Sequence, residues 1–252
     1  MQTNNLKASL PLYLSLSLIL SSLSITFAST NGAAHSFTSQ KADEMALSQA
    51  LEMKTTPMDL EMGLAYSKTE ACKQEFEAAV ADGKRAIDEA LKTAKHGQAF
   101  AVVSDIDETV LDNRQYLEDK AKKVTTGQSD VDWGKFENWA IEARAKPLEP
   151  TVRLLAYARS KKVAVFFVTG RMEKLRKPTI ENLLRADIAY DGLYLRPDGD
   201  KRHASEYKSQ VRKSIEDMGF TIALNIGDQC SDLSGGHAMD CEKLPNRMYY
   251  IP

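Results

Sequence analysis

The stretch Ala99-Phe-Ala-Val-Val-Ser-Asp-Ile-Asp-Glu-Thr-Val110 decides the fold of this chain. Its first part, Ala99–Ser104, is a short and mostly apolar run that ends where the acidic residues begin. Such a run, without alternating polar positions, is typical of a strand whose two faces are both buried in a parallel sheet. Two later runs share this character: Val163–Val168 and Ile222–Ile226.

Helical patterns separate these apolar runs. They cover Thr151–Ser160, Arg176–Arg185 and Glu206–Met218. Alternation of buried strands with amphipathic helices predicts an α/β protein with a doubly wound, Rossmann-like parallel sheet. Two weaker strand candidates are Gly192–Leu195 and Met248–Ile251.

The sheet is expected to belong to one domain that covers residues 41–252. Residues 41–98 have a helical pattern and form a predicted helical extension, which Pro57 should divide into at least two helices. Residues 112–150 are longer than a connection between a strand and a helix needs to be. We therefore expect a small, mostly helical cap beside the edge of the sheet.

Each of the three confident strands runs into a polar cluster. Because ligands bind outside the carboxyl ends of strands in open α/β sheets, these clusters should converge on one place. The converging carboxylates are Asp105, Asp107, Asp228 and Asp232. Crowded carboxylates repel one another unless a cation lies among them, and ligand sets made only of oxygen favour Mg²⁺. The sequence therefore predicts a magnesium site, which would also screen an incoming phosphate.

The pair Asp105-Ile-Asp107 allows two interpretations. One carboxylate could attack phosphorus in line, while the other protonates the leaving alcohol and later deprotonates water. Alternatively, the two carboxylates could act only as a metal clamp. The spacing by itself leaves both interpretations open.

Four ordered motifs resemble those of the haloacid-dehalogenase-like (HAD) superfamily. They are Asp105-Ile-Asp-Glu-Thr-Val, Thr169-Gly-Arg, Lys208 and Gly227-Asp-Gln-Cys-Ser-Asp232. The longer run from Asp105 to Asn113 and the ending Lys243-Leu-Pro-Asn-Arg-Met-Tyr-Tyr-Ile-Pro252 are similar to the acid phosphatase branch (class B, subfamily IIIB). That branch contains bacterial secreted acid phosphatases, plant acid phosphatases and vegetative storage proteins. The similarity covers about residues 60–252.

The resemblance implies a magnesium-dependent acid phosphatase with an aspartyl-phosphate intermediate on Asp105. Asp107 would be the general acid and base, Thr169 would bind the transferring phosphoryl group, and Lys208 would neutralise charge on it. An acidic pH optimum is expected, because Asp107 must be protonated to act as an acid.

The resemblance also implies the metal ligands. Asp105 and Asp228 would bind Mg²⁺ directly, Asp107 would bind it through its backbone carbonyl, and Asp232 would support it directly or through water. Electrostatic stabilisation of this kind is what phosphoryl transfer mainly needs.

For substrate binding we expect contributions from Gly170, Arg171 and Trp133. The aromatic residues of the cap could stack on a nucleobase, so a nucleoside monophosphate is one candidate among small phosphomonoesters. Alternatively, Phe136 and Trp139 only pack the cap against the sheet, as their helical spacing suggests.

Two other functions remain open at this stage. A phosphotransferase would move phosphate to an acceptor alcohol instead of water. A binding or storage protein could keep the fold with weak activity, although the presence of Asp105 disfavours it.

The N-terminal residues predict export to the periplasm or secretion. Lys7 is followed by an uncharged segment, Leu10–Phe27, and by small residues around Ala28. This order of regions is typical of a signal peptide over residues 1–28, with a flexible segment over 29–40. An uncleaved anchor is the alternative; after cleavage no membrane association is expected.

The charge balance bears on partners. The chain has 33 basic and 35 acidic residues, with a formal net charge of -2. Proteins that bind nucleic acid through bulk charge need a basic surface, so this class is disfavoured. Homo-oligomers remain open.

The chain has three cysteines: Cys72, Cys230 and Cys241. Cys230 and Cys241 are close in sequence on either side of Ser234-Gly-Gly236, and an exported protein meets an oxidising compartment. A disulfide between these two is therefore predicted. Cys72 is expected to be a small buried apolar residue on a helix.

Overall fold

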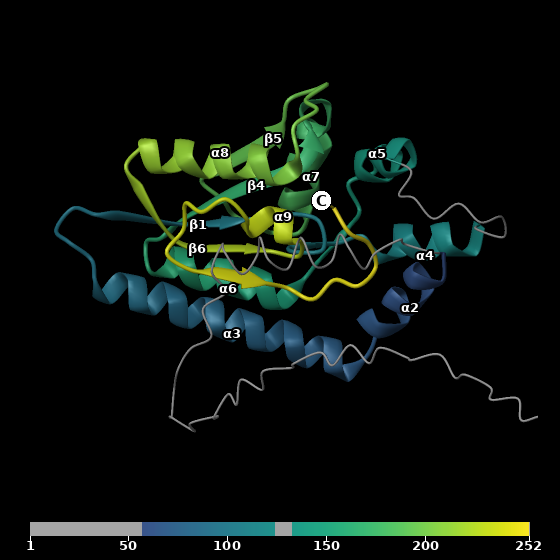
Figure 1. Cartoon of the computed structure of the whole chain (residues 1–252), viewed down its shortest axis with the longest axis horizontal. Helices are drawn as coiled ribbons and strands as arrows, with labels where there is room; N and C mark the ends of the chain where they lie inside the picture. Colours follow the sequence, from purple (N-terminus) through teal and green to yellow (C-terminus); the bar gives the residue numbers. More distant parts are fainter. Residues whose placement is uncertain (1–56, 124–132, 252) are drawn as a thin grey trace, which may run out of the picture. The chain divides into compact units, whose positions relative to one another are not determined.

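The computed structural model describes residues 57–123 and 133–251, which are built around a parallel sheet with strand order β5-β4-β1-β6-β7 (Figure 1). The strands are Ala99–Ser104 (β1), Ala164–Met172 (β4), Gly192–Arg196 (β5), Phe220–Gly227 (β6) and Cys241–Lys243 (β7). From the central β1 the chain proceeds to β4 and β5 on one side, and later to β6 and β7 on the other. The sheet is therefore doubly wound, as the sequence predicts.

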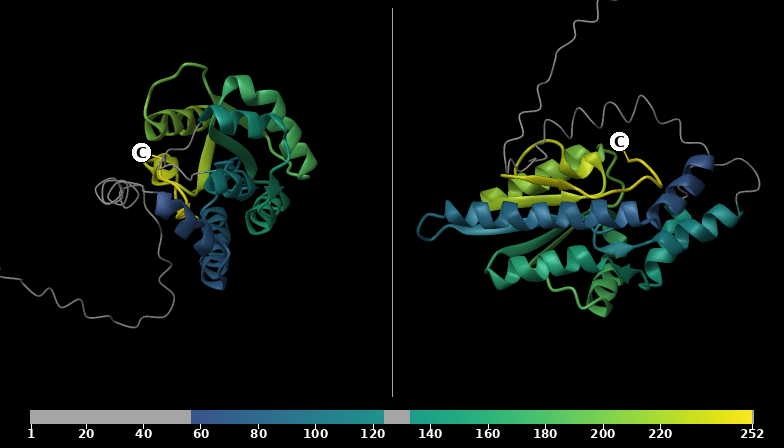
Figure 2. Two further views of the ribbon diagram at one scale, coloured as in Figure 1. Left: turned by 90° about the vertical axis from the view of Figure 1, so that its right-hand side faces the viewer. Right: turned by 90° about the horizontal axis from the view of Figure 1, so that it is seen from below.

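Helices cover both faces of this sheet. The helices α3 (Glu70–Lys92) and α6 (Glu149–Ser160) lie on one face, and α8 (Ala204–Asp217) lies on the other, as the views of Figures 1 and 2 agree. Between β4 and β5 the chain forms the 3-10 turn η1 (Glu173–Leu175) and α7 (Arg176–Arg185). A short helix, α9 (Cys230–Leu233), follows β6.

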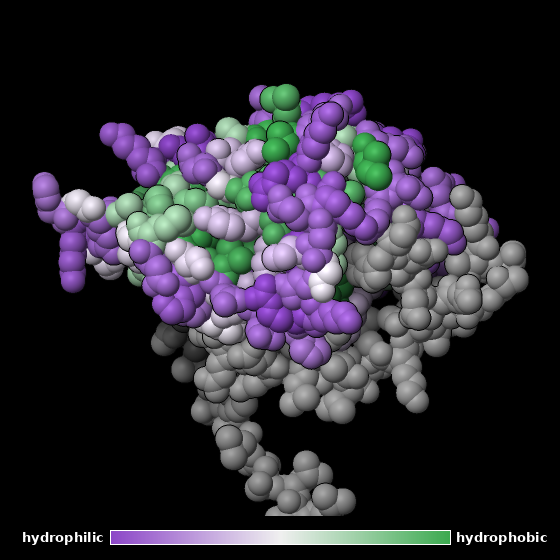
Figure 3. All heavy atoms as spheres, turned by 90° about the horizontal axis from the view of Figure 1, so that it is seen from above, coloured by the Kyte–Doolittle hydropathy of each residue, from purple (hydrophilic) through white to green (hydrophobic). Residues whose placement is uncertain are grey.

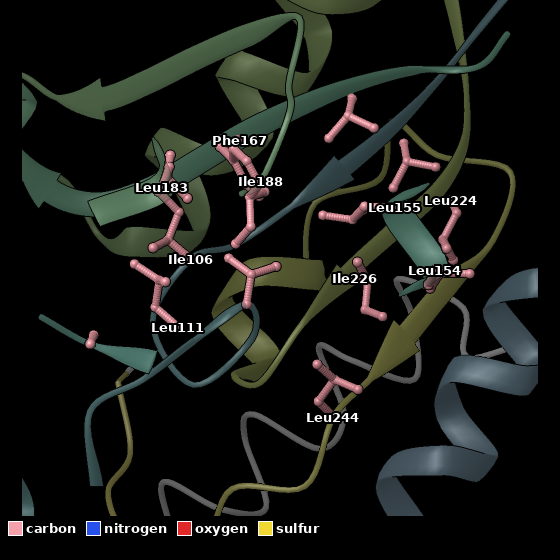
Figure 4. Packing of buried hydrophobic residues seen from close by; sticks show 14 of the residues in the cluster. Ile106, Leu111, Leu154, Leu155, Phe167, Leu183, Ile188, Leu224, Ile226 and Leu244 are labelled. Atoms are coloured by element: carbon pink, nitrogen blue, oxygen red, sulfur yellow. The ribbon is translucent and has the colours of Figure 1, made fainter. Parts of the chain in front are cut away.

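Alternate residues of the central strands pack into separate apolar clusters. Val102 of β1 and Phe167 of β4 belong to the larger cluster, which includes residues of α3, α6 and α7 (Figure 4). Their neighbours Val103 and Phe166 belong to the cluster that contains Ile215 of α8. Because both faces are apolar, the strands lack polar alternation. This packing explains why the uninterrupted apolar runs predicted them.

The cap residues lie beyond the carboxyl ends of the strands (Figure 1). Two helices, α4 (Arg114–Lys123) and α5 (Trp133–Ile141), stand between the short strands β2 (Leu111–Asp112) and β3 (Lys146–Pro147), which pair antiparallel. Tyr116 of α4 contacts the rings of Phe136 and Trp139, with centroids 5.5 Å and 6.4 Å away. These contacts hold the two cap helices together.

The helical extension includes α2 (Pro57–Ser67) and α3. Pro57 is the first residue of α2, a position where a missing backbone N–H costs nothing. The break between the described helices comes at Thr69, whose hydroxyl accepts a hydrogen bond from the backbone N–H of Cys72 at 3.2 Å and caps α3. The predicted signal peptide (1–28) and flexible segment (29–40) lie outside the described residues.

In the part of the chain that the structure describes, every helix is too short or too polar to cross a membrane. Figure 3 shows one face, on which hydrophilic residues predominate and hydrophobic residues gather in smaller areas between them. Such a mixture is usual for a protein surface.

The prediction of a strand at Met248–Ile251 is wrong. The edge strand is instead Cys241–Lys243, which is too short and too polar to be found from its pattern. The backbone near Ile251 pairs with side chains: its N–H donates to Oε1 of Gln229 at 3.1 Å, and its carbonyl accepts from Ser231 at 3.0 Å. These bonds replace those of a sheet.

The predicted disulfide is also wrong, since no bridge joins Cys230 and Cys241 among the described residues. Cys241 pairs with Asn225 at the start of β7, and the residue of α9 that packs on it is Leu233. Cys230 lies at the opposite end of α9, beyond the end of β6. Cys72 is buried, as expected.

Gly63 of α2 offers a test of how the extension packs on residues 247–248. A Cβ atom at this position would lie 2.1 Å from the carbonyl oxygen of Arg247 and 2.7 Å from Cα of Met248. We expect Gly63→Ala to lower the free energy of unfolding by about 1–3 kcal/mol through overpacking, although alanine is the better helix former. Denaturant unfolding measures the change. The control is Met62→Ala at an exposed neighbour; increased stability in Gly63→Ala would contradict this packing.

Candidate active site

The loop after β1 directs Asp105 and Asp107 to the same side of the sheet edge. Between them, Ile106 is fully buried in the core, and its carbonyl accepts hydrogen bonds from Val110 and Leu111 at 2.9 Å each. The backbone N–H of Asp105 donates to the carbonyl of Ile226 in β6 at 3.0 Å. The loop is therefore tied both to itself and to the neighbouring strand.

Three aspartates from two segments, one after β1 and one after β6, meet at this edge. Asp105, Asp228 and Asp232 are buried, and each offers a carboxylate oxygen within 4.8 Å of the other two. Lys208 of α8 lies between two of them, with Nζ 2.5 Å from Oδ1 of both Asp105 and Asp232. Of the four carboxylates predicted to converge, Asp105, Asp228 and Asp232 come together in the structure, whereas Asp107 is not part of this cluster.

The charges at this edge strongly affect one another. Burial raises the pKa of Asp105 well above its usual range against the effect of Lys208, and the neighbouring aspartates add to the rise. Burial and Asp232 raise the pKa of Asp228 to about 6, while hydrogen bonds from Asn246 and Gln229 oppose this rise. For Lys208, burial favours the neutral amine, but Asp105 and Asp232 outweigh it and raise the pKa. The ammonium group of Lys208 thus offsets the negative charge of both Asp105 and Asp232.

Neutral donors hold Asp228 in place. Its Oδ2 accepts hydrogen bonds from the side-chain amides of Gln229 and Asn246 at 2.7 Å each. Its Oδ1 accepts one from the hydroxyl of Thr109 at 3.2 Å. These donors orient the carboxylate without adding positive charge.

Asp232 is held by the turn that starts α9. Its Oδ2 accepts a hydrogen bond from the backbone N–H of Gln229 at 2.8 Å. A Cβ atom on Gly227 would lie 2.4 Å from the same oxygen, so only glycine leaves room for this carboxylate. The glycine of the Gly227-Asp228 motif thus has a packing reason.

These residues suit a divalent metal such as Mg²⁺. The donor atoms are all oxygen, they come from three convergent carboxylates, and their mutual repulsion would be relieved by a cation. Asp107 is outside this set of side chains, and its predicted contribution is a backbone carbonyl.

Asp107 is fixed by an arginine that the sequence assigned to the substrate. The guanidinium of Arg171 donates to Asp107 through Nε at 3.0 Å and through Nη2 at 2.6 Å. The Arg171 side chain is only 1% exposed and also donates to Thr179 at 3.2 Å. In this structure Arg171 therefore positions Asp107, although it also borders the cavity.

Asn113 completes this arrangement, and sequence reasoning assigned it no role. Its amide donates to Oδ1 of Asp107 at 2.8 Å, and its carbonyl accepts from the indole of Trp139 at 2.8 Å. Trp139 therefore anchors a hydrogen-bond chain in addition to packing the cap. The signal was present in the run Asp105–Asn113, which ends at this residue.

Thr169 and Gly170 directly precede Arg171 near the end of β4. The hydroxyl of Thr169 is buried and accepts a hydrogen bond from the backbone N–H of Arg171 at 3.1 Å. Gly170 is exposed and borders the cavity. The side chain of Trp133, the first residue of α5, lies outside the described residues.

A cavity of about 420 Å³ opens over these groups. Its wall combines the acidic edge with apolar and aromatic residues of the cap, of η1 and of residues 249–251. Basic residues at the end of β5 and after it complete the wall. The lining includes Asp105, Asp107, Lys208, Asp228, Asp232, Tyr116, Phe136, Leu175, Tyr249, Tyr250, Arg196 and Arg202. Its size suits a small molecule.

Residues 246–251 also contribute to the site, and no role had been assigned to them. Besides Asn246 on Asp228, the hydroxyl of Tyr249 donates to Glu108, a buried residue of the loop that carries Asp105. The side-chain amide of Gln229 donates to the carbonyl of Tyr249 at 3.4 Å. The strand prediction missed this role, because these residues form hydrogen bonds with active-site residues and do not join the sheet.

Comparisons with known proteins agree with this geometry. A family model described as HAD superfamily, subfamily IIIB (acid phosphatase), matches residues 22–252. Acid phosphatase 1 of Solanum lycopersicum is 36% identical over 152 residues, which are 59% of this chain and 58% of that protein. Vegetative storage protein 1 of Arabidopsis thaliana is 31% identical over 152 residues, or 60% of this chain and 55% of that protein. The matches thus span between 55% and 58% of these relatives.

A solved structure shares the fold. It is the class C acid phosphatase from Bacillus anthracis, with a TM-score of 0.64 and 24% identity, covering 77% of this chain and 86% of that one. Because the family model matches nearly the whole sequence, this chain belongs to subfamily IIIB of the HAD superfamily, the acid phosphatase family.

Proposed function

We propose that this protein is a magnesium-dependent acid phosphatase that hydrolyses small phosphate monoesters through an aspartyl-phosphate intermediate on Asp105. The observation that carries the proposal is the convergence of Asp105, Asp228 and Asp232 within 4.8 Å, at the edge of a cavity of about 420 Å³. The two acid phosphatases among the relatives and solved structures support the same reaction class.

The first half of the reaction forms the intermediate. A carboxylate oxygen of Asp105 attacks phosphorus in line with the ester oxygen, and the bond from phosphorus to that oxygen breaks. The departing alkoxide takes a proton from Asp107, so an alcohol leaves. Arg171 and Asn113 hold Asp107 in place, while Lys208 and Thr169 bind the transferring group.

The second half releases phosphate. Asp107, now a carboxylate, accepts a proton from water as the water oxygen attacks phosphorus. The bond from phosphorus to Asp105 breaks, inorganic phosphate leaves, and both carboxyl groups return to their starting states. Mg²⁺ bound by Asp105, Asp228, Asp232 and the Asp107 carbonyl would supply positive charge against the phosphoryl oxygens.

Two alternative functions are compatible with the same active-site residues. In a phosphotransferase an acceptor alcohol replaces water in the second half, and phosphorylated product would appear when a nucleoside is added. A storage protein is suggested by the names of two relatives, Vegetative storage proteins 1 and 2 of Arabidopsis thaliana. From the pattern of residues 1–28 we also infer that the protein acts after export.

Replacing the nucleophile separates enzyme from storage protein. We expect Asp105→Asn to lower the rate of p-nitrophenyl phosphate hydrolysis at saturating Mg²⁺ by at least about a thousandfold, because an amide cannot form the intermediate. Release of p-nitrophenol measures the rate. The control is Asp187→Asn, an exposed aspartate after α7. Equal rates in Asp105→Asn and wild type would remove the enzyme proposal.

Asn246 tests the metal site from outside its ligand set. We expect Asn246→Ala to weaken Mg²⁺ binding by about 10- to 100-fold, because Asp228 loses one of the donors that orient it. The activity of the variant should recover at high Mg²⁺, and a Mg²⁺ titration of activity and of the melting temperature measures the shift. Met239→Ala, at an exposed position, is the control. An unchanged Mg²⁺ midpoint would contradict this role of Asn246.

The pH dependence follows from Asp228. Its pKa in the metal-free protein is raised to about 6, so its folded state holds a proton more tightly than the unfolded state does. Below about pH 6 protons compete with the metal, and above it the ionised group destabilises the metal-free fold. We expect Mg²⁺ affinity to fall between pH 7 and pH 5, and added Mg²⁺ to extend activity toward lower pH.

Calorimetric Mg²⁺ titrations at pH 5, 6 and 7 check the affinity, and pH–rate profiles at low and high Mg²⁺ check the activity. Affinity that is constant over this range would contradict the assignment of Asp228 as a ligand. The proposed acidic optimum has its own test, since a maximum of kcat/KM above pH 8 would rule it out.

A further inference from the structure

The active-site cavity has a basic end that the proposed reaction does not use. Arg196, the last residue of β5, lines the cavity together with Arg202, His203 and Ala204 of the segment that leads into α8. Lys208, on the next turn of α8, borders the same cavity from the catalytic side.

The guanidinium of Arg202 already has hydrogen-bond partners within the protein. Its Nε donates to both carboxylate oxygens of Asp200, at 3.1 Å and 2.9 Å, and its other nitrogens donate to Asp200 and to Gln210. These bonds lower the pKa of Asp200 to about 2. Arg202 and Asp200 thus form a satisfied pair at the wall of the cavity.

This arrangement leaves the positive charge of Arg196 only weakly balanced by Asp200. Its nearest carboxylate oxygen is on Asp200, 4.0 Å from Nη2, at the outer limit of an ion pair, and its side chain is only 15% exposed. The Nε atom is buried and has no hydrogen-bond partner among the described residues. A buried donor without a partner is costly, and a guanidinium binds carboxylate and phosphate groups through paired N–H donors.

The sheet sets the distance between this arginine and the nucleophile. Ser104 pairs with Phe167, which pairs with Leu193, so β1 and β5 are two strand spacings apart. At about 4.8 Å per spacing, Arg196 approaches the cavity on the order of 10 Å to one side of Asp105. Both side chains reach into the cavity, so a short carbon chain could bridge an anion on Arg196 and a phosphorus at Asp105.

We propose that Arg196 forms a second anion-binding subsite, so that the preferred substrates are small phosphomonoesters that carry a second phosphate or carboxylate group. This inference rests on the proposed phosphatase function. The second anion would pair with the guanidinium of Arg196 where this residue lines the cavity, while the phosphate that is hydrolysed lies at Asp105.

Matched substrate pairs test the subsite and distinguish the two anions. The carboxylate pair is 3-phosphoglycerate and glycerol 3-phosphate; the phosphate pair is glucose 1,6-bisphosphate and glucose 6-phosphate. In wild type we expect kcat/KM for the doubly anionic member to exceed that of its partner by about 10- to 100-fold in at least one pair. Ratios near or below one in both pairs would overturn the proposal.

Variants at Arg196 connect the preference to this residue. We expect Arg196→Gln to bring the ratio close to one, and Arg196→Lys, which keeps the charge without the fork, to give an intermediate ratio. The matched control is Arg153→Gln on α6, whose partner is Glu77 and which is not in the cavity wall; its ratio should equal that of wild type. An unchanged ratio in both Arg196 variants would overturn the proposal.

A binding measurement separates this proposal from the proposed function. Calorimetry with Mg²⁺ compares 3-phosphoglycerate with glycerol 3-phosphate, and glucose 1,6-bisphosphate with glucose 6-phosphate, on Asp105→Asn and on the double variant that adds Arg196→Gln. We expect a preference for the doubly anionic ligand in the first protein and its loss in the second. If wild type hydrolyses no monoester, the phosphatase proposal fails, and the same comparison on wild type and Arg196→Gln still decides the subsite. Equal affinities within both pairs would overturn it.

Discussion

The structure depends on holding three buried carboxylates together against their mutual repulsion. Asp105, Asp228 and Asp232 lie within 4.8 Å of one another in a place that water reaches poorly. Burial and like charge both oppose ionisation there, as the raised pKa values of Asp105 and Asp228 show. Lys208 places a positive charge between Asp105 and Asp232, and neutral donors orient Asp228 and Asp232. A phosphate monoester bound at this edge would add negative charge, which would have to be balanced in the same way.

Separate elements supply this balance because the parallel sheet places their ends side by side. Asp105 follows β1, Asp228 follows β6, and Lys208 enters from α8. The Arg171–Asp107 contact then joins the last residues of β4 to the loop after β1, so Asp107 is fixed by a second strand end. Tyr249 and Asn246 close the arrangement from a segment far along the chain. Asp105, Asp107 and Asp228 thus each have a hydrogen-bond partner from another part of the sequence.

The rim of the cavity is packed less tightly than its floor. On the floor, Asp232 and Gly227 fit so closely that a single added carbon would clash. On the rim, aromatic residues of α4 and α5 and basic residues at the end of β5 and after it surround a space larger than a phosphate group needs. The tight floor thus fixes the acidic groups, while the rim leaves room around them and carries Arg196, whose Nε has no hydrogen-bond partner among the described residues.

The sequence by itself determined the central strands, the main helices and the acidic cluster. Unbroken apolar runs report burial on both faces, and Asp105, Asp228 and Asp232 follow those runs directly, so local pattern and topology agree. Tertiary structure alone decided the edge strand Cys241–Lys243, the separation of Cys230 from Cys241, and the surroundings of Asn113, Arg171, Arg196 and Asn246. Most of these depend on a contact between residues distant in the chain, and neither periodicity nor spacing encodes which distant side chain a donor will meet.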